Sequence, residues 1–256
     1  MAIAVKKIMG IARASIKKVA GKGNSGNELF THPLFSDGNL QGYWRLEADG
    51  VDSGPNGYDI AAGTSPSFVV GKFGNGADFE ASSSQYLTRA SVANLRITGS
   101  QTWGCWMKLE TASLSRAMGR VNASPTFNFV NLGVSVGTGV GAHASFQAQN
   151  LATNTYVEGA ATMSTGIWYF MVGIYDSANT KLKVWLNDVK TEVTASGSTS
   201  SAGTEAFSLG RAGAYAGDYF DGIIDDAFVF NRALTDAEVL SLYNTMVKKF
   251  AGVSNV

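Results

Sequence analysis

The sequence predicts an all-β protein whose strands form antiparallel sheets, with one helix close to the C-terminus. The first observation is composition: the 256 residues include 30 glycines and 11% aromatics but only four prolines. The second is that short runs of alternating apolar and polar residues recur between residues 40 and 231, separated by glycine-rich breaks. Such runs give strands that each bury one face, as in a sandwich or barrel. One large domain accounts for this length.

Eleven runs are rich enough in β-branched and aromatic residues to predict strands. They occupy residues 40–47, 67–71, 77–80, 85–89, 102–110, 126–137, 143–149, 167–176, 181–189, 206–211 and 220–231. The segment GKFGNG at 71–76 lacks the Gly-Lys-Ser/Thr ending and the following helix of a phosphate-binding loop, so it predicts a hairpin turn. The single cysteine, Cys105, lies between tryptophans and is expected in the core, which excludes a disulfide framework.

One helix is predicted after the last strand. Thr235 and Glu238 have the spacing of a capping box, which marks a helix start. Apolar residues then follow at helical spacing, and they are Val239, Leu240, Leu242, Tyr243 and Met246. We expect this helix to close one end of the sandwich.

The chain divides into a basic N-terminal arm at 1–26, a linker at 27–39, a sandwich domain at 40–249 and a tail at 250–256. The arm is set apart by its charge. The arm contains six basic residues and no acid, which leaves the rest of the chain at −6. The sandwich is therefore a poor nucleic-acid binder. The arm could dock into a homo-oligomer or larger assembly, meet an anionic surface such as a membrane or nucleic acid, or be a solvated tail.

Lysine pairs recur in the arm every 11 residues, in VKKIMG and IKKVAG, and interrupt any apolar core of a signal peptide. A retained arm is therefore favoured over a cleaved leader. No apolar run approaches the roughly 20 residues that span a bilayer, so we expect no transmembrane segment.

The last predicted strand carries two adjacent acids in the sequence GIIDDAFVF. Side chains alternate along a strand, so Asp225 and Asp226 should point to opposite faces. A buried unpaired carboxylate is costly, so the inward acid needs a cation or several donors. We expect Asp225 to be the inward acid. Asp226 is expected on the solvent side or near the rim, because two buried carboxylates repel each other.

Five segments occur in the order found in a known family. They are GYWRLEADGVDSGPNGYD, GKFGNGADFEASSSQYLT, TWGCWMKL, GIWYFMVGIYDSANTKLKVWLNDV and FSLGR followed by FDGIIDDAFVFNRALTDAEVLSLYN. In this order the chain resembles the laminin-G-like branch of the concanavalin A-like lectin and glucanase superfamily over residues 40–247. The resemblance implies a two-sheet antiparallel jelly-roll sandwich, often with a calcium ion near one edge, that binds carbohydrate or protein ligands.

The resemblance also implies positions for the metal. Asp52, in the turn DSGPNG at 52–57, and Asp225 become candidate calcium ligands, with Glu47 and Asn56 as supporting residues. Calcium takes six to eight oxygen ligands, which an acidic strand beside a glycine-rich turn can offer. The alternative is a metal-free arrangement in which Asp225 accepts backbone N–H groups from the early turn or pairs with an arginine, Arg211 or Arg232.

Candidate ligand-binding residues lie in the glycine-rich loop before the last strand. Tyr215 and Tyr219 can present aromatic faces to a sugar, and Asp218 can accept its hydroxyl groups. Catalysis is not expected, because the chain lacks the Glu-x-Asp-x-x-Glu pattern of retaining glycosidases in this superfold and lacks other nucleophile motifs.

Two functions remain open from the sequence. One is a noncatalytic, lectin-like adhesion module that binds glycans or a surface protein. The other is a structural decoration or fibre-head protein of a virion or similar assembly, anchored through the basic arm. Both place the sandwich outside the cell or on a virion surface, and they differ in what residues 1–26 do.

Overall fold

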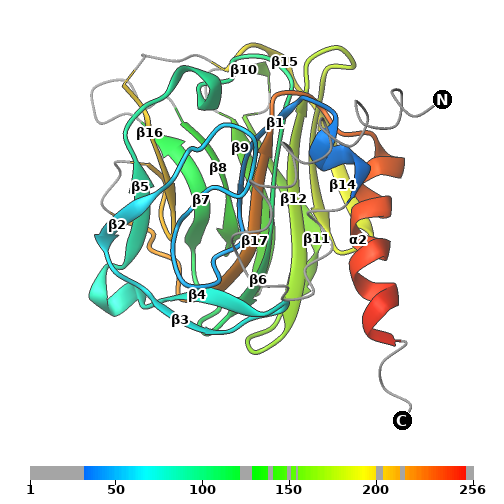
Figure 1. Ribbon diagram of the computed structural model, residues 1–256. Helices are drawn as coiled ribbons and strands as arrows, with labels where there is room; N and C mark the ends of the chain where they lie inside the picture. Colours follow the sequence, from blue (N-terminus) through cyan, green and yellow to red (C-terminus); the bar gives the residue numbers. More distant parts are fainter. Residues whose placement is uncertain are drawn as a thin grey trace, which may run out of the picture.

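A computed structural model describes residues 32–121, 129–137, 141–148, 151–153, 155–199, 204–213 and 217–251 (Figure 1). The arm at 1–26, the start of the linker, Tyr215 and residues 252–256 lie outside the described residues.

Two antiparallel sheets confirm the all-β sandwich (Figure 1). The eight-stranded sheet has the order β14-β13-β12-β6-β17-β4-β3, with β1 also paired to β17. Its strands are β1 (Leu40–Trp44), β3 (Ser67–Val70), β4 (Asn75–Phe79), β6 (Gln101–Leu109), β12 (Trp168–Asp176), β13 (Lys181–Leu186), β14 (Val189–Thr194) and β17 (Gly222–Phe230). The turn predicted at 71–76 joins β3 to β4 as a hairpin.

The seven-stranded sheet has the order β11-β9-β8-β7-β16-β5-β2. Its strands are β2 (Ala61–Thr64), β5 (Tyr86–Arg89), β7 (Ser115–Val121), β8 (Phe129–Ser135), β9 (Ala142–Ala148), β11 (Tyr156–Met163) and β16 (Ala206–Leu209). A separate short pair is formed by β10 (Leu151–Thr153) and β15 (Ser196–Gly197). Strands β2, β7, β11 and β14 and the short pair β10 and β15 were not predicted, because each contains many small or polar residues and their apolar alternation is weak.

Aromatic side chains fill the space between the two sheets. The Trp44 ring stacks on the Phe207 ring with centroids 4.6 Å apart, and the Trp103 ring lies 5.6 Å from the same ring. All three side chains are buried. Cys105 is also buried in this core, as predicted. Burial of these large rings supplies much of the hydrophobic stabilisation of the sandwich.

A second apolar layer covers the outer face of the eight-stranded sheet. It is made by α2 (Asp236–Ala251) and the short 3-10 helix η2 (Pro33–Ser36). Figure 1 shows α2 lying along one side of the sandwich. Val239 and Leu242 from α2 belong to one buried cluster with Trp106 and Phe170 of the sheet. The helix therefore covers a sheet face, and the expectation that it closes one end of the sandwich was wrong: its apolar stripe matches aromatic side chains that the sheet directs outward.

The linker is anchored in the same layer. The Phe35 ring lies 4.8 Å from the Tyr43 ring and 5.8 Å from the Phe228 ring in edge-on contacts. His32 Nε2 is 3.1 Å from Ser241 Oγ in α2. The start of the described chain and the first turns of α2 thus pack on the same sheet. Among the described residues no helix is long and apolar enough to cross a membrane.

The helix begins with the capping box that the sequence predicted. The backbone N–H of Glu238 donates to Thr235 Oγ1 at 3.3 Å, and the N–H of Thr235 donates to Glu238 Oε2 at 2.8 Å. The Arg232 guanidinium donates to both oxygens of Glu238 and also binds Asp37 at 2.6 Å. Hydrogen bonds from Arg232 lower the pKa of Glu238 from 4.5 to about 2.

This pair predicts a loss of stability in acid. The folded-state pKa of Glu238 lies below its unfolded value, so the ionised form stabilises the folded state above pH 4.5 and the benefit is lost as the pH falls toward 2. We expect a loss of at most about 2 kcal/mol, because the pair is partly exposed and screened. Urea unfolding at pH 7 and pH 3 should show a smaller pH dependence in Glu238→Gln than in the wild type. Equal pH dependence in the two proteins would exclude this role.

Candidate functional site

Asp225 and Asp226 are both buried inside the protein, at 0% exposure. Asp225 Oδ2 accepts hydrogen bonds from the backbone N–H groups of Lys72 and Phe73, each at 2.8 Å. Asp226 Oδ1 accepts a hydrogen bond from the Tyr43 hydroxyl at 2.6 Å. The two acids therefore attach β17 to two other parts of the eight-stranded sheet: the β3–β4 turn and β1.

The expectation that Asp226 lies at the rim was wrong, and the backbone gives the reason. The pairing of β17 with β6 is interrupted by a β-bulge between Asp225 and Phe228, and Asp226 has a left-handed φ of +51°. A bulge breaks the alternation of side chains, so adjacent residues need not point to opposite faces. Asp226 is thereby turned toward Tyr43.

Burial and the neighbouring Asp226 raise the pKa of Asp225 well above its ordinary value, while the N–H groups of Phe73 and Lys72 lower it. Burial also raises the pKa of Tyr43, and Asp226 adds to that shift, so the hydroxyl keeps its proton and acts as a donor. Asp225 Oδ1 is buried and has no hydrogen-bond partner among the described residues. This oxygen is where a cation or a proton would lower the cost of two adjacent buried carboxylates.

Asp52 organises the early turn. Its Oδ1 accepts the N–H groups of Tyr43 at 2.9 Å and Gly54 at 2.7 Å, and its Oδ2 accepts the N–H of Tyr58 at 2.8 Å. Asn56 donates from Nδ2 to the carbonyl oxygens of Leu40 and Gln41, at 3.3 and 3.0 Å. Both side chains hold the turn at 52–58 against β1. The turn at 52–57 supplies none of the donors to Asp225, so this part of the expectation was wrong.

Glu47 binds the β3–β4 turn. Its Oε2 accepts the N–H of Asn75 at 3.0 Å, and its Oε1 lies 2.7 Å from the Arg45 guanidinium. Gly74 has a φ of +77°, and a Cβ atom there would lie 2.5 Å from Glu47 Oε2. Glu47 and Asp225 therefore both bind the β3–β4 turn, whereas Asp52 and Asn56 stabilise the turn at 52–58. Arg211 lies over the Tyr86 ring and Arg232 binds Asp37 and Glu238.

In the described ranges, a different group of three acids brings its carboxylate oxygens together. Carboxylate oxygens of Asp78, Glu80 and Glu110 all lie within 4.8 Å of one another. Burial and the charges of these neighbours raise the pKa of Glu110. This group is partly or fully exposed and contains none of the four predicted metal ligands. It offers a second place to which a cation in solution could bind, so it serves as a control below.

The loop before β17 brings Asp218 and Tyr219 to the outer side of the seven-stranded sheet. Asp218 Oδ2 lies 3.5 Å from an Arg116 guanidinium nitrogen on β7, and the Asp218 carbonyl accepts the Arg116 N–H at 2.8 Å. The Tyr219 ring lies 6.4 Å from the Tyr86 ring of β5. The structure thus joins two of the three predicted ligand-binding residues to the sheet.

Other polar side chains share this side of the sheet. Inward residues of β8, β9 and β11 such as Leu132, Phe146 and Val157 belong to the inter-sheet core, so their neighbours in the chain point outward. We call the outward set the polar face, and its members are Arg116, Asn131, Ser135, His143, Ser145, Gln147, Tyr156, Glu158, Asp218 and Tyr219. Their common signal in the sequence is polar alternation along β8, β9 and β11, which the prediction did not use.

Hydrogen bonds order the polar face. The Tyr156 hydroxyl binds Glu158 Oε2 and lies 2.7 Å from Ser135 Oγ. Burial, together with the hydrogen bond to Glu158, raises the pKa of Tyr156 to about 12. Asn131 donates from Nδ2 to Gln147 Oε1 at 3.2 Å, while its own Oδ1 is buried and has no partner among the described residues. Arg116, Asn131, Ser135 and Ser145 are buried beneath this face. The partly exposed members, which a ligand could reach, are His143, Gln147, Tyr156, Glu158, Asp218 and Tyr219.

Comparison with known proteins agrees with this architecture. A family model described as the concanavalin A-like lectin/glucanases superfamily matches residues 81–240. The chain belongs to this superfamily. A search of curated protein sequences found no match.

Solved structures share the superfamily fold. Domain 4 of AbnA, an extracellular arabinanase from Geobacillus stearothermophilus solved with arabinotriose, has a TM-score of 0.60 and 19% identity, covering 80% of this chain and 98% of that one. The binding domain of Paraclostridial Mosquitocidal Protein 1 has a TM-score of 0.61 and 12% identity, covering 81% and 52%. A Ruminococcus gnavus sialidase CBM40 bound to α2,3 sialyllactose has a TM-score of 0.51 and 12% identity, covering 66% and 95%. At these identities the likeness shows the fold alone.

Removing the Tyr43 hydroxyl should destabilise the protein strongly for the loss of a single oxygen atom. Tyr43→Phe should lower the free energy of unfolding by about 1.5–3 kcal/mol, because a buried acid loses its donor. Tyr58→Phe is the matched control, since the Tyr58 hydroxyl makes no hydrogen bond to a described residue. Urea unfolding at pH 7 measures both. Equal stabilities for the two variants would contradict the role of the Tyr43–Asp226 bond.

Calcium binding at Asp225, which the superfamily resemblance implied, stays a prediction with a direct test. Calcium at 100 times its dissociation constant should raise the free energy of unfolding by about 2.7 kcal/mol. Asp225→Asn should remove this increase and Glu110→Gln should not. An increase lost only in Glu110→Gln would place the ion at the exposed acids. Melting that is the same with calcium and with a chelator would exclude calcium binding at both places.

Proposed function

We propose that the chain is a noncatalytic recognition module that binds glycans through the polar face. The observation that carries this proposal is the difference between the outer faces of the two sheets. Outward aromatics of the eight-stranded sheet are covered by α2 and η2. The outward side chains of the seven-stranded sheet are hydroxyls, amides and charged groups, which suit a hydroxyl-rich ligand.

The arrangement of the reactive groups supports a noncatalytic role. Asp225 and Asp226 are fully buried and bonded to protein groups, so a polysaccharide in solvent has no access to them. His143 Nδ1 lies 2.9 Å from the Gly159 carbonyl, and the Cys105 thiol is buried with a raised pKa. A glycosidase needs two carboxyl groups that flank the bond to be cleaved. The two carboxylates of the polar face are instead engaged by protein groups: Asp218 by the Arg116 guanidinium and Glu158 by the Tyr156 hydroxyl.

Relatives in fold support the ligand class and the compartment. The arabinanase domain was solved with arabinotriose and the CBM40 with sialyllactose, and the arabinanase is described as extracellular. By this analogy we place the chain outside the cell. The alternative of a protein ligand has support from a related toxin binding domain solved with synaptotagmin II. The virion decoration hypothesis and assembly through residues 1–26 stay predictions, since the arm lies outside the described residues.

The polar face predicts which substitutions weaken binding. Asp218→Asn and Tyr219→Ala should each reduce affinity for the best glycan on a broad array about 3- to 30-fold, because each removes one anchoring contact. Asp188→Asn is the matched control, since Asp188 is exposed in the β13–β14 turn of the other sheet. Array binding followed by titration calorimetry measures the change.

The outcome separates the ligand classes. Binding that is unaffected by Asp218→Asn and Tyr219→Ala would exclude the polar face. A folded protein that binds no glycan on the array would favour a protein ligand, and repeating the array with a chelator shows whether calcium contributes.

A further inference from the structure

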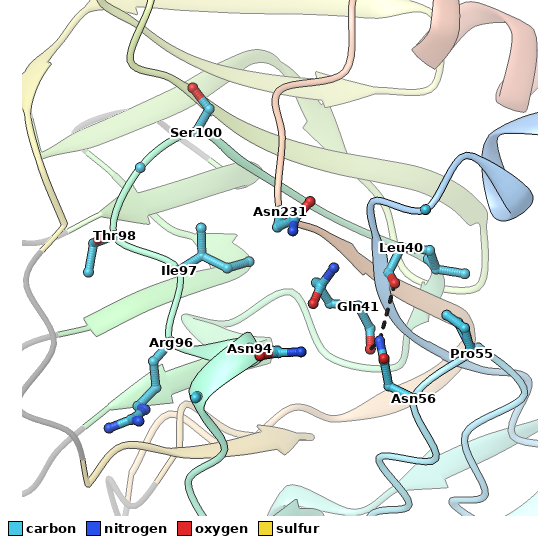
Figure 2. A pocket seen from close by; sticks show the side chains of 13 residues that line it. Leu40, Gln41, Pro55, Asn56, Asn94, Arg96, Ile97, Thr98, Ser100 and Asn231 are labelled. Carbon is cyan, nitrogen blue, oxygen red and sulfur yellow. Dashed lines mark hydrogen bonds between the residues drawn. The ribbon is translucent and has the colours of Figure 1, made fainter.

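A groove of about 660 Å³ lies at one rim of the sandwich, apart from the polar face. One wall is β1 with the turn after it, and the other is the segment that runs from the 3-10 helix η4 (Ala93–Leu95) to β6. Figure 2 shows the groove from close by. The lining residues are Gly38, Leu40, Gln41, Pro55, Asn56, Ala93, Asn94, Arg96, Ile97, Thr98, Gly99, Ser100 and Asn231. A volume of this size suits a small ligand or one unit of a larger one.

Four carboxamide side chains converge on this groove from four separate segments. Gln41 comes from β1, Asn56 from the early turn, Asn94 from η4 and Asn231 from the end of β17. Figure 2 shows their amide groups gathered around the space beside Ile97. Asn56 and Gln41 use their NH₂ groups on backbone carbonyls, which leaves their oxygens available, while the amides of Asn94 and Asn231 make no hydrogen bond to a described residue.

Buried polar groups fix the segment from η4 to β6, which forms the wall opposite β1. The Ile97 carbonyl accepts hydrogen bonds from Gln101, Arg120 and Thr199, whose side chains are buried. The Thr98 carbonyl accepts the N–H of Thr199 at 3.0 Å. These bonds fix the segment before a ligand arrives. Pre-organised groups lose less conformational entropy on binding, which favours affinity.

The chemistry of the lining selects the ligand. A carboxamide is neutral and offers both a donor and an acceptor, which is the pattern that a sugar hydroxyl also offers. Leu40, Pro55 and Ile97 add apolar surface for the C–H face of a ring. Arg96 is the one charged residue in the lining, and Figure 2 shows its guanidinium directed away from the four amides. The groove therefore lacks a charge aimed at the ligand.

We propose that this rim groove is a second carbohydrate site that binds a neutral sugar unit through Gln41, Asn56, Asn94 and Asn231. This inference rests on the proposed function, since it takes the chain to be a glycan-binding module. It adds a site whose ligand is uncharged, in contrast to the charged groups of the polar face. With two sites, one chain can hold a glycan at two points, and the avidity of such a module exceeds the affinity of either site.

The test follows side-chain amide signals by nuclear magnetic resonance in the full chain. Asn94→Ala and Asn231→Ala assign the two amide signals, and both positions are exposed, so the variants should fold. The probes are a panel of neutral monosaccharides, namely arabinose, galactose, glucose, mannose, xylose and N-acetylglucosamine. At least one should shift both signals, and each variant should weaken that sugar about 3- to 10-fold. Asn244→Ala, an exposed asparagine on α2, is the matched control and should bind as the wild type does.

Affinity at the groove should change less than twofold between 50 and 500 mM salt, because the ligand is uncharged. A steep salt dependence, or amide shifts caused only by an acidic sugar or a peptide, would overturn the proposal. If no sugar moves the amide signals while Asp218→Asn still weakens binding to the array glycan, the groove fails and the proposed function holds. If the chain binds neither the panel nor the array, both fail.

Discussion

Two buried acids on β17 attach this strand to β1 and to the β3–β4 turn of the eight-stranded sheet. Asp225 receives two N–H groups of the β3–β4 turn, and Asp226 receives the hydroxyl of Tyr43 on β1. Tyr43 in turn donates its N–H to Asp52, which shapes the early turn. A chain of bonds therefore runs from the last strand through the first strand to a turn some 170 residues earlier. Buried charges of this kind are expensive to leave unsatisfied, so each partner is fixed to one geometry.

That geometry also determines which surfaces of the sandwich are available to ligands. Because β1 is held on β17, the N-terminal helix η2 lies over the same sheet as α2, and together they remove the outer aromatics from water. The opposite sheet has polar outward side chains, of which Tyr156, Glu158, Asp218 and Tyr219 are partly exposed. The rim groove lies where β1, η4 and the end of β17 approach one another. The shape of the groove thus depends on the anchoring of β1.

The fold was predictable from the sequence, because its signals are local. Alternation in runs such as 102–110 and 167–176 identified β6 and β12, and the spacing of Thr235 and Glu238 identified the start of α2. The position of Asp226 was not predictable by alternation, since it depends on a bulge with a left-handed residue. The donors to Asp225 were assigned to the wrong turn for a related reason. The turns at 52–57 and 71–76 are both rich in glycine, so the sequence does not distinguish them. The pairing of β4 with β17 places the turn at 71–76 beside Asp225. Strands β7 and β11 were missed because their outward residues belong to the polar face or are small.

The candidate sites were predictable only in part. Asp218 and Tyr219 could be proposed because an aromatic and an acid occur together in one glycine-rich loop. The groove could not, because its four amides are single residues in segments as far apart as 41 and 231, and each alone is an ordinary surface side chain. Their convergence is a property of the packing of β1, η4 and β17, which no local pattern contains.

The contact between His32 and α2 has a consequence for how the domain is oriented. His32 lies beside Ser241, so the chain enters and leaves the sandwich on the α2 side. The polar face lies on the opposite sheet. Anything joined to the domain before residue 32 or after residue 251 is therefore attached behind it, and the polar face is directed outward from the point of attachment.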